Sequence, residues 1–220
     1  MRYSRANPST RYGDMLNQYR CMHTEGEKFL GLPPERTFPG QSLFAQAGRI
    51  KDMILSHSAR SVLDYGSGKG MQYQPMPIRV EGIGEWPSIQ AFWDVDQIYC
   101  YDPCYQPFNK LPDRKFDAVI STDVLEHCPE EDIPWIIDEI FSYANRFVFA
   151  NVACYPAKKR LPSGENAHCT IRPPEWWESI LLETSARYAG VAWEVWVQYI
   201  TDAATGKQFA EQRLGNSPSS

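Results

Sequence analysis

Several features of secreted, membrane and nucleic-acid-coating proteins are missing from this sequence. No run of about 18 apolar residues occurs, so a membrane-spanning helix is not expected. The first eight residues have no apolar core of the kind a signal peptide needs, and the six cysteines include no CxxC pair. A net charge of −5 disfavours a protein that coats duplex DNA. We therefore expect a cytoplasmic protein with reduced thiols and neither a membrane nor a duplex-DNA partner.

The remaining composition is that of an ordinary globular protein. Of 220 residues, 43% are hydrophobic and 22% are charged, which suffices for one domain with two or three layers. Residues 1–40 are polar and rich in arginine, tyrosine, glycine and proline, so we interpret them as an N-terminal arm or lid with one helix within 12–30. A single domain is expected over 41–214 and a disordered tail over 215–220.

Hydrophobic patterns alternate between strand and helix along this domain. Such alternation is typical of an α/β fold with three layers, in which helices cover both faces of a doubly wound, mostly parallel sheet. A closing hairpin around a turn at 202–207 adds an antiparallel edge strand. The sequence predicts strands at 61–65, 97–101, 116–121, 147–152, 193–199 and 208–213, and helices at 42–56 (capped by Ser42), 88–93, 129–145 and 173–183.

A glycine cluster follows the first predicted strand. Residues 64–70 have the form Asp-x-Gly-x-Gly-x-Gly, and glycines allow positive φ and a close approach of backbone to ligand. A dinucleotide fingerprint would need a small residue where Met71 stands. A phosphate-binding P-loop would need glycine at Leu63 and serine or threonine at Gly70. The spacing excludes both motifs.

The remaining pattern resembles the first motif of class I S-adenosylmethionine-dependent methyltransferases, whose glycines pack against the methionine and ribose of the cofactor. Asp102, at the end of the second strand, is similar to the acid that binds both ribose hydroxyls in that family. Residues 116–127 are similar to the fourth motif of the small-molecule branch, beside the transferable methyl group. The resemblance covers residues 42–150 and implies S-adenosylmethionine as cofactor and S-adenosylhomocysteine as product. It implies these cofactor-binding residues: Asp64, Tyr65, Gly66, Ser67, Gly68, Gly70, Asp102, Pro103, Thr122 and Asp123.

Two spacings depart from the family pattern. The distance from Asp64 to Asp102 is long, so residues 71–94 are interpreted as an insertion. The distance from Asp102 to Asp117 is too short for the usual helix and strand, so the third motif has no counterpart. Either the sheet lacks one strand or Asp102 combines two motifs. The adenine contacts are therefore unassigned.

The fourth-motif strand end also narrows the methyl acceptor. Methyltransferases of DNA amino groups carry Asn/Asp-Pro-Pro-Tyr there, whereas residues 121–124 are Ser-Thr-Asp-Val. Cytosine C5 enzymes need a Pro-Cys nucleophile, and the only such pair, at 103–104, follows a different strand. We expect an oxygen or nitrogen acceptor on a small molecule, with a sugar or an RNA end as alternatives, methylated by in-line SN2 displacement.

Candidate catalytic groups are Asp123 and His168. The pattern Asp123-x-x-Glu126-His127 with a later histidine resembles metal-dependent 2′-O-methyltransferases of small-RNA ends and the catechol O-methyltransferases of the ubiquinone pathway. That resemblance implies a divalent metal held by Asp123, Glu126, His127 and His168, and a helix starting at Asp123 would place the first three on one face. In metal-free relatives the Glu-His pair only braces a helix, and His168 would then be a general base.

Other residues near these motifs leave alternatives open. The three cations at 158–160 follow a strand at the expected catalytic edge, where they would either receive an acceptor phosphate or carboxylate or form a solvated loop. A catalytically silent cofactor-binding subunit or sensor is the alternative function, although this chain keeps the loop acid and glycines that silent subunits usually lose. Aromatic candidates for an acceptor pocket are Tyr12, Tyr19, His23, Tyr65, Tyr73 and Tyr105.

Overall fold

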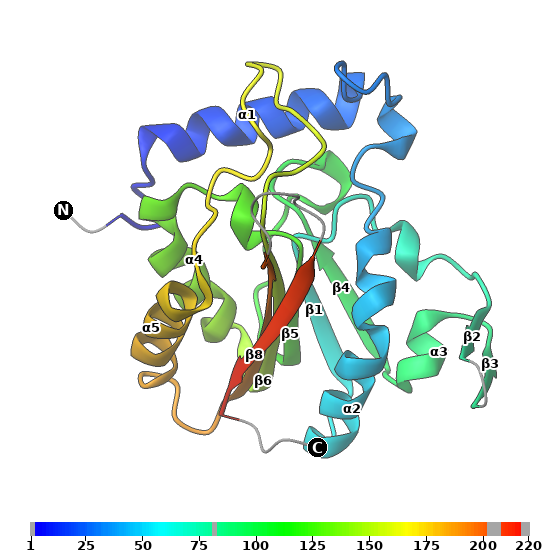
Figure 1. Cartoon of the computed structure of the whole chain (residues 1–220). Helices are drawn as coiled ribbons and strands as arrows, with labels where there is room; N and C mark the ends of the chain where they lie inside the picture. The colour runs from blue at the N-terminus through cyan, green and yellow to red at the C-terminus, as the bar shows by residue number, and fades with distance from the viewer. Residues whose placement is uncertain (1–2, 81–82, 202–207, 217–220) are drawn as a thin grey trace.

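The computed structural model describes residues 3–80, 83–201 and 208–216 and has one six-stranded sheet. Five neighbouring strands run parallel, and the last strand pairs antiparallel at the edge, in the order β4-β1-β5-β6-β7-β8 (Figure 1). The predicted fold class is confirmed; the turn at 202–207 and most of the predicted tail lie outside the described residues. The strands are β1 (Ser61–Tyr65), β4 (Gln97–Tyr101), β5 (Phe116–Thr122), β6 (Ala144–Cys154), β7 (Ala192–Ile200) and β8 (Phe209–Gly215).

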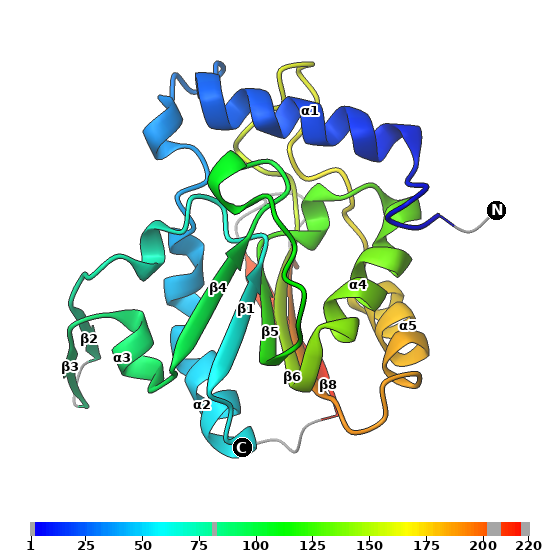
Figure 2. The same ribbon diagram turned by 180° about the vertical axis from the view of Figure 1, so that it is seen from behind.

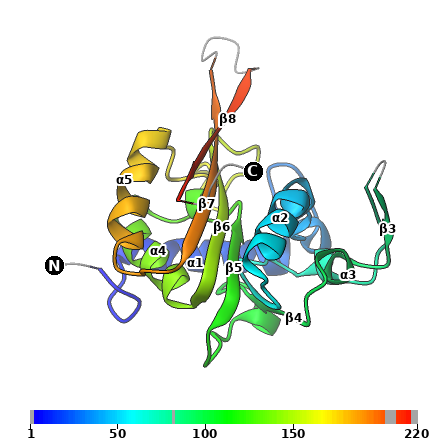
Figure 3. The ribbon, with the colours of Figure 1, turned by 90° about the horizontal axis from the view of Figure 1, so that it is seen from below.

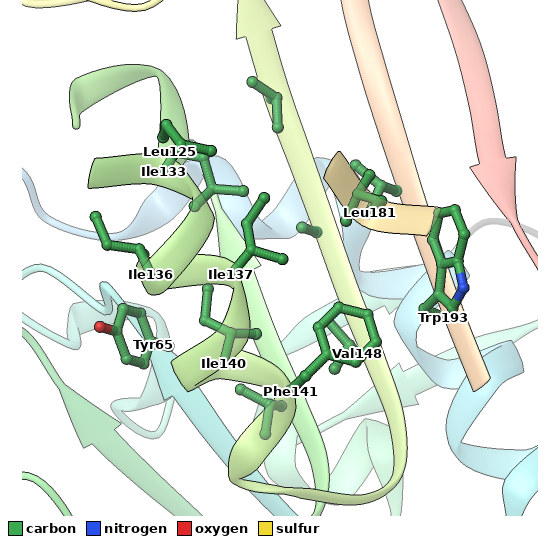
Figure 4. Packing of buried hydrophobic residues seen from close by; sticks show 14 of the residues in the cluster. Tyr65, Leu125, Ile133, Ile136, Ile137, Ile140, Phe141, Val148, Leu181 and Trp193 are labelled. Atoms are coloured by element: carbon green, nitrogen blue, oxygen red, sulfur yellow. The ribbon is translucent and has the colours of Figure 1, made fainter. Parts of the chain in front are cut away.

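Helices cover both faces of this sheet (Figure 3). On one face lie α2 (Ala47–His57) and α3 (Ile89–Trp93), and on the other lie α4 (Ile133–Ser142) and α5 (Pro174–Ser185). The isoleucines of α4 recur at intervals of three and four, so one stripe of the helix packs on the sheet near Val148, while Leu181 of α5 lies near Trp193 in the same cluster (Figure 4). Full burial of each such side chain contributes about 1.5–3 kcal/mol. In the described part of the chain, no helix has the length and apolar character required to cross a bilayer.

Two helix boundaries differ from the prediction. The helix expected from residue 42 begins at Ala47 after a 3₁₀ turn over Gln41–Gln46, and Ser42 is not its cap. The helix expected from residue 129 begins at Ile133, after a 3₁₀ turn over Glu130–Asp132. The carboxylate of Asp132 accepts hydrogen bonds from the backbone N–H of Ser9 at 3.0 Å and from the indole of Trp135 at 2.7 Å, so a residue more than 120 positions away in the sequence contacts this turn.

The two segments whose lengths depart from the family pattern differ in structure. The long one, expected as an insertion at 71–94, contains a two-stranded hairpin, β2 (Ile78–Val80) and β3 (Gly84–Trp86), followed by α3. The short segment at 102–115, all of it described, has one 3₁₀ turn over Gln106–Phe108 and neither an α-helix nor a strand. The sheet therefore ends at β4, and this segment adds no strand to it, which agrees with the first of the two alternatives that the short spacing left open.

The strand order reverses beside β1. The chain leaves β1 for β4 on one side and then crosses to β5 on the other. In open α/β sheets, ligands bind outside the carboxyl ends of the strands at such a switch point. Helix α1 (Thr10–Glu25) and the loop 155–173 cross above this edge (Figures 1 and 2). A ligand-binding site is therefore expected at this edge of the sheet.

Helix α1 is fixed at both ends. Before it, the guanidinium of Arg5 pairs with Glu139 and donates to the hydroxyl of Tyr65 at 2.9 Å. After it, the backbone N–H of Lys69 donates to the carbonyl of Phe38 at 2.9 Å. The N-terminal segment is therefore attached to the sheet domain on both sides of α1.

Candidate functional site

A cavity of about 940 Å³ lies at the switch point, below α1. Its walls come from the segments that follow β1, β4, β5 and β6 and from the N-terminal segment. Two predicted residues do not line it: Gly70 packs against Phe108, and Glu126 is fully buried. The predicted residues that line it are Asp64, Tyr65, Gly66, Ser67, Gly68, Asp102, Pro103, Thr122, Asp123, His127 and His168.

Residues 66–70, the glycine loop, are wedged between two other segments. Gly66 has φ +94°, and a Cβ there would lie 2.3 Å from Cγ2 of Val124. Gly68 has φ +59°, and a Cβ there would lie 2.4 Å from the carbonyl oxygen of Phe38. Neither position accepts a side chain, because both the backbone conformation and the packing exclude one. The loop is thereby held in one conformation at the floor of the cavity.

Asp64 is a buried carboxyl group that is only half satisfied. Its Oδ2 accepts hydrogen bonds from the hydroxyl of Tyr73 at 2.7 Å and from Nε2 of Gln72 at 3.1 Å. Among the described residues, its Oδ1 has no partner, and neither does the hydroxyl of Ser67. Burial raises the pKa of Asp64 to about 7. Two unpartnered polar atoms beside a cavity fit a ligand that carries hydrogen-bond donors.

Asp102 is held rigidly at the end of β4. The N–H of Gly68 donates to its Oδ2 at 3.0 Å, and the N–H of Cys104 donates to its Oδ1 at 2.8 Å. Burial raises its pKa to about 6, although the backbone N–H groups of Cys104, Gly68 and Tyr105 favour the ionised form. Nε2 of His23 lies 3.9 Å from its Oδ1. Each carboxylate oxygen has two lone pairs, so acceptor capacity remains for a ligand diol.

A second polar group, the histidine cluster, consists of Glu126, His127 and His168. One ligand atom from each of these residues lies within 4.8 Å of the others. The segment Leu125–His127 is a 3₁₀ turn, so the helical face predicted from Asp123 onward does not form. Asp123 has φ +53°, and its carboxylate accepts a hydrogen bond from the side chain of Asn151. The structure thus groups three of the four predicted metal ligands and leaves Asp123 outside the group.

Both imidazoles of the cluster point one nitrogen at a backbone carbonyl. Nδ1 of His127 lies 2.9 Å from the carbonyl of Ala167, and Nδ1 of His168 lies 2.6 Å from that of Tyr155. A carbonyl only accepts, so each Nδ1 carries the proton and each Nε2 keeps its lone pair. Burial lowers the pKa of His127 to about 3 and also lowers that of His168. Both rings are therefore neutral at pH 7.

Glu126 completes the cluster from below. Its Oε1 accepts the N–H of Ala153 at 3.0 Å, and its Oε2 has no partner among the described residues. Burial raises its pKa well above the ordinary range, and the charge of Asp123 raises it further. The protonated acid would ionise beside a cation, because a metal ion inverts the local preference. Two imidazoles and a carboxylate are donors that suit divalent transition metals.

The structure extends the predicted pocket. Of the aromatic candidates, Tyr12, Tyr19, His23 and Tyr65 line the cavity, whereas Tyr73 supports Asp64 from behind and Tyr105 lies off the wall. Sequence reasoning missed three groups: Phe38, Asn151 and Tyr155. Asn151 lies near the carboxyl end of β6, and Tyr155 directly follows the strand, which ends at Cys154 and not at the predicted residue 152. A polar side chain within an otherwise apolar strand was the available signal for Asn151.

No known family model matches this chain, and no curated protein sequence matches it either. Function is therefore inferred from the residues around the cavity.

Proposed function

We propose that this protein is an S-adenosylmethionine-dependent methyltransferase that acts on an oxygen or nitrogen of a small molecule. The observation that carries the proposal is a convergence: the glycine loop, Asp102 and two imidazoles of the histidine cluster face one cavity at the switch point of the sheet. Residues that would bind the cofactor and residues that would accept a proton from the acceptor thus line the same cavity. A sugar or an RNA end is the alternative acceptor.

The first of these groups of residues fits the cofactor. Asp102 would accept hydrogen bonds from the two ribose hydroxyls through its remaining lone pairs. Oδ1 of Asp64 and the hydroxyl of Ser67 would meet the polar groups of the methionine part, which gives these unpartnered atoms a ligand partner. When bound, S-adenosylmethionine supplies an electrophilic methyl group on its sulfonium.

The second group of residues fits an acceptor that must lose a proton. Without a bound metal, His168 is neutral and keeps a lone pair on Nε2, so it would accept a proton from a hydroxyl or an amine; with a metal, the same lone pair would bind the ion instead. Asp123, held in place by Asn151, would orient the acceptor through its carboxylate. Side chains of α1 line one wall of the cavity and would help to hold the acceptor in line with the methyl group.

A divalent cation is the second component that the cluster fits. Metal-bound histidines usually donate their other N–H to a carbonyl or carboxylate, and both cluster imidazoles do so. Glu126 would add the third ligand through Oε2, and Asp123 lies close enough to influence the charge of Glu126. A bound cation would polarise an acceptor hydroxyl. The chain's own part is to present neutral imidazoles at pH 7.

The cofactor proposal is tested by calorimetry with S-adenosylmethionine and S-adenosylhomocysteine. We expect both to bind, and we expect Asp102→Ala to weaken binding about a hundredfold, because two charge-assisted hydrogen bonds are lost. Asp113→Ala is the matched control, since Asp113 is an exposed acid on the loop before β5. Failure of the wild-type protein to bind either ligand would reject the assignment.

Transfer of a labelled methyl group separates an enzyme from a silent subunit. Labelled S-adenosylmethionine is incubated with the small-molecule and RNA fractions of a cell extract, with and without a chelator. We expect label in the small-molecule fraction and its loss with His168→Ala. Binding without label in either fraction would favour the silent subunit or sensor. Turnover that persists undiminished in chelator would remove the metal from the proposal.

A further inference from the structure

Lys159 lies on the loop after β6, with its side chain in the wall of the cavity. Its ammonium lies 4.7 Å from the centre of the Phe38 ring. Its charge lowers the pKa values of His127, His168 and His23, so it stands near all three imidazoles. The cation therefore belongs to the same space as the histidine cluster.

Hydrogen bonds within the loop connect Lys159 to the histidine cluster. The N–H of Ala167 donates to the carbonyl of Lys159 at 3.2 Å, and the carbonyl of Ala167 in turn accepts from His127. Asn166 braces the loop: its amide exchanges two hydrogen bonds of 2.9 Å with the backbone of Ala157 and accepts the N–H of His168 at 2.9 Å. The backbone of Lys159 is thus hydrogen-bonded to Ala167, the residue directly before His168.

The ammonium has no anionic partner within the described residues. In the described part of the chain, its Nζ makes no hydrogen bond or ion pair and lies over the ring face of Phe38. The charges of two acids, Glu27 and Asp123, act on Lys159, but both carboxylates accept hydrogen bonds elsewhere. Glu27 accepts the backbone N–H groups of Phe29, Leu30 and Arg160, and Asp123 accepts the side-chain amide of Asn151. By contrast, Lys69 is engaged with the ring and carbonyl of His23. A half-buried ammonium without an acceptor is costly unless a ligand provides one.

We propose that Lys159 binds an anionic group, carboxylate or phosphate, on the methyl acceptor and so selects small anionic acceptors. The inference rests on the proposed function, because the acceptor is defined by the cluster that lies beside Lys159. A cavity of about 940 Å³ has room for a cofactor together with a small acceptor. An anion on Lys159 would present the rest of the acceptor to His127 and His168.

The test compares anions with a neutral molecule of the same shape. Benzoate, benzamide and inorganic phosphate are titrated by NMR into the full-length protein, with and without S-adenosylhomocysteine. We expect benzoate to bind roughly tenfold to a hundredfold more tightly than benzamide in the wild-type protein, the range for a charge-assisted contact. Comparison of benzoate with phosphate then shows which anion geometry the site prefers.

Three variants locate the effect. Lys159→Met keeps the aliphatic stem over Phe38 and should abolish the preference for anions, whereas Lys159→Arg should retain it. Lys115→Met, which removes an exposed cation just before β5, should leave it unchanged. Equal affinity for benzoate and benzamide in the wild-type protein, or an undiminished preference in Lys159→Met, would overturn the inference. Because the titrations without S-adenosylhomocysteine do not depend on the cofactor, a failure of the cofactor proposal would appear separately.

Discussion

The glycine-loop side of the cavity and the histidine side hold their polar groups by different means. On the first side, Gly66 and Gly68 pack so closely that the backbone itself forms the surface. On the second side, the imidazoles are oriented by hydrogen bonds: Nδ1 of His127 meets the carbonyl of Ala167 and the hydroxyl of Tyr19, and Nδ1 of His168 meets the carbonyl of Tyr155 on its own loop. A side chain added to a glycine on the first side should therefore destabilise the whole fold. On the second side, removal of one hydrogen bond should disturb the orientation of one imidazole while the protein stays folded.

The largest effect is expected for Gly66→Ala. The added methyl group would meet Val124 at 2.3 Å, in a backbone conformation that alanine rarely adopts. We expect a loss of about 2–4 kcal/mol in the free energy of unfolding, measured by denaturant titration. Gly13→Ala, within α1 and with no atom within 4 Å of the new methyl group, should instead stabilise the protein by about 0.5–1 kcal/mol. Similar changes in the free energy of unfolding for Gly66→Ala and Gly13→Ala would show that close packing at Gly66 does not limit the side chain there.

Asp64→Asn should change stability in the opposite direction, and only at high pH. Burial raises the folded pKa of Asp64 from 3.8 to about 7, so the folded state binds this proton more tightly than the unfolded state. Stability is then lost as pH rises from about 4 towards 7, and the variant avoids that loss. We expect a melting temperature about 2–6 °C above wild type at pH 8 and equal to it at pH 4.

The same substitution should weaken S-adenosylhomocysteine binding at least tenfold, because a ligand donor loses its charged acceptor. Asp113→Asn, at an exposed position, is the control for both scanning calorimetry and binding. A variant that is less stable than wild type at pH 8 would show that the carboxylate of Asp64 is satisfied in the absence of ligand.

The smallest effect on the fold is expected for Tyr19→Phe. The hydroxyl of Tyr19 donates to the carbonyl of Ala167 at 2.7 Å and lies 2.9 Å from Nδ1 of His127. Its removal should cost about 1 kcal/mol of stability and weaken Mn²⁺ binding about ten- to a hundredfold, while S-adenosylhomocysteine affinity stays within about twofold. Tyr99→Phe removes a comparable hydroxyl–carbonyl bond away from the cavity and should spare Mn²⁺ affinity.

The two sides also differ in how far the sequence predicts them. The glycine loop and Asp102 follow their strands directly, so their place at the carboxyl edge was predictable from local pattern. The residues of the histidine cluster were predictable as well, but their partners were not, because Tyr19 and Ala167 approach from remote segments. Asp123 was assigned to a helical face that does not form, since Asn151 and the positive φ of Asp123 turn its carboxylate elsewhere. Hydrogen bonds between remote segments orient these side chains, and a local sequence pattern does not contain them.

The fixation of α1 at both ends has a consequence for the order in which the molecule assembles. This helix and the residues just before it are synthesised before the sheet, yet their partners Asp132, Glu139 and Ala167 follow more than 100 residues later. These contacts are of long sequence separation and should form late in folding, after the sheet has assembled. The sheet can therefore exist with an open edge before the cavity closes, and the capacity to bind a ligand would be the last property that the chain acquires.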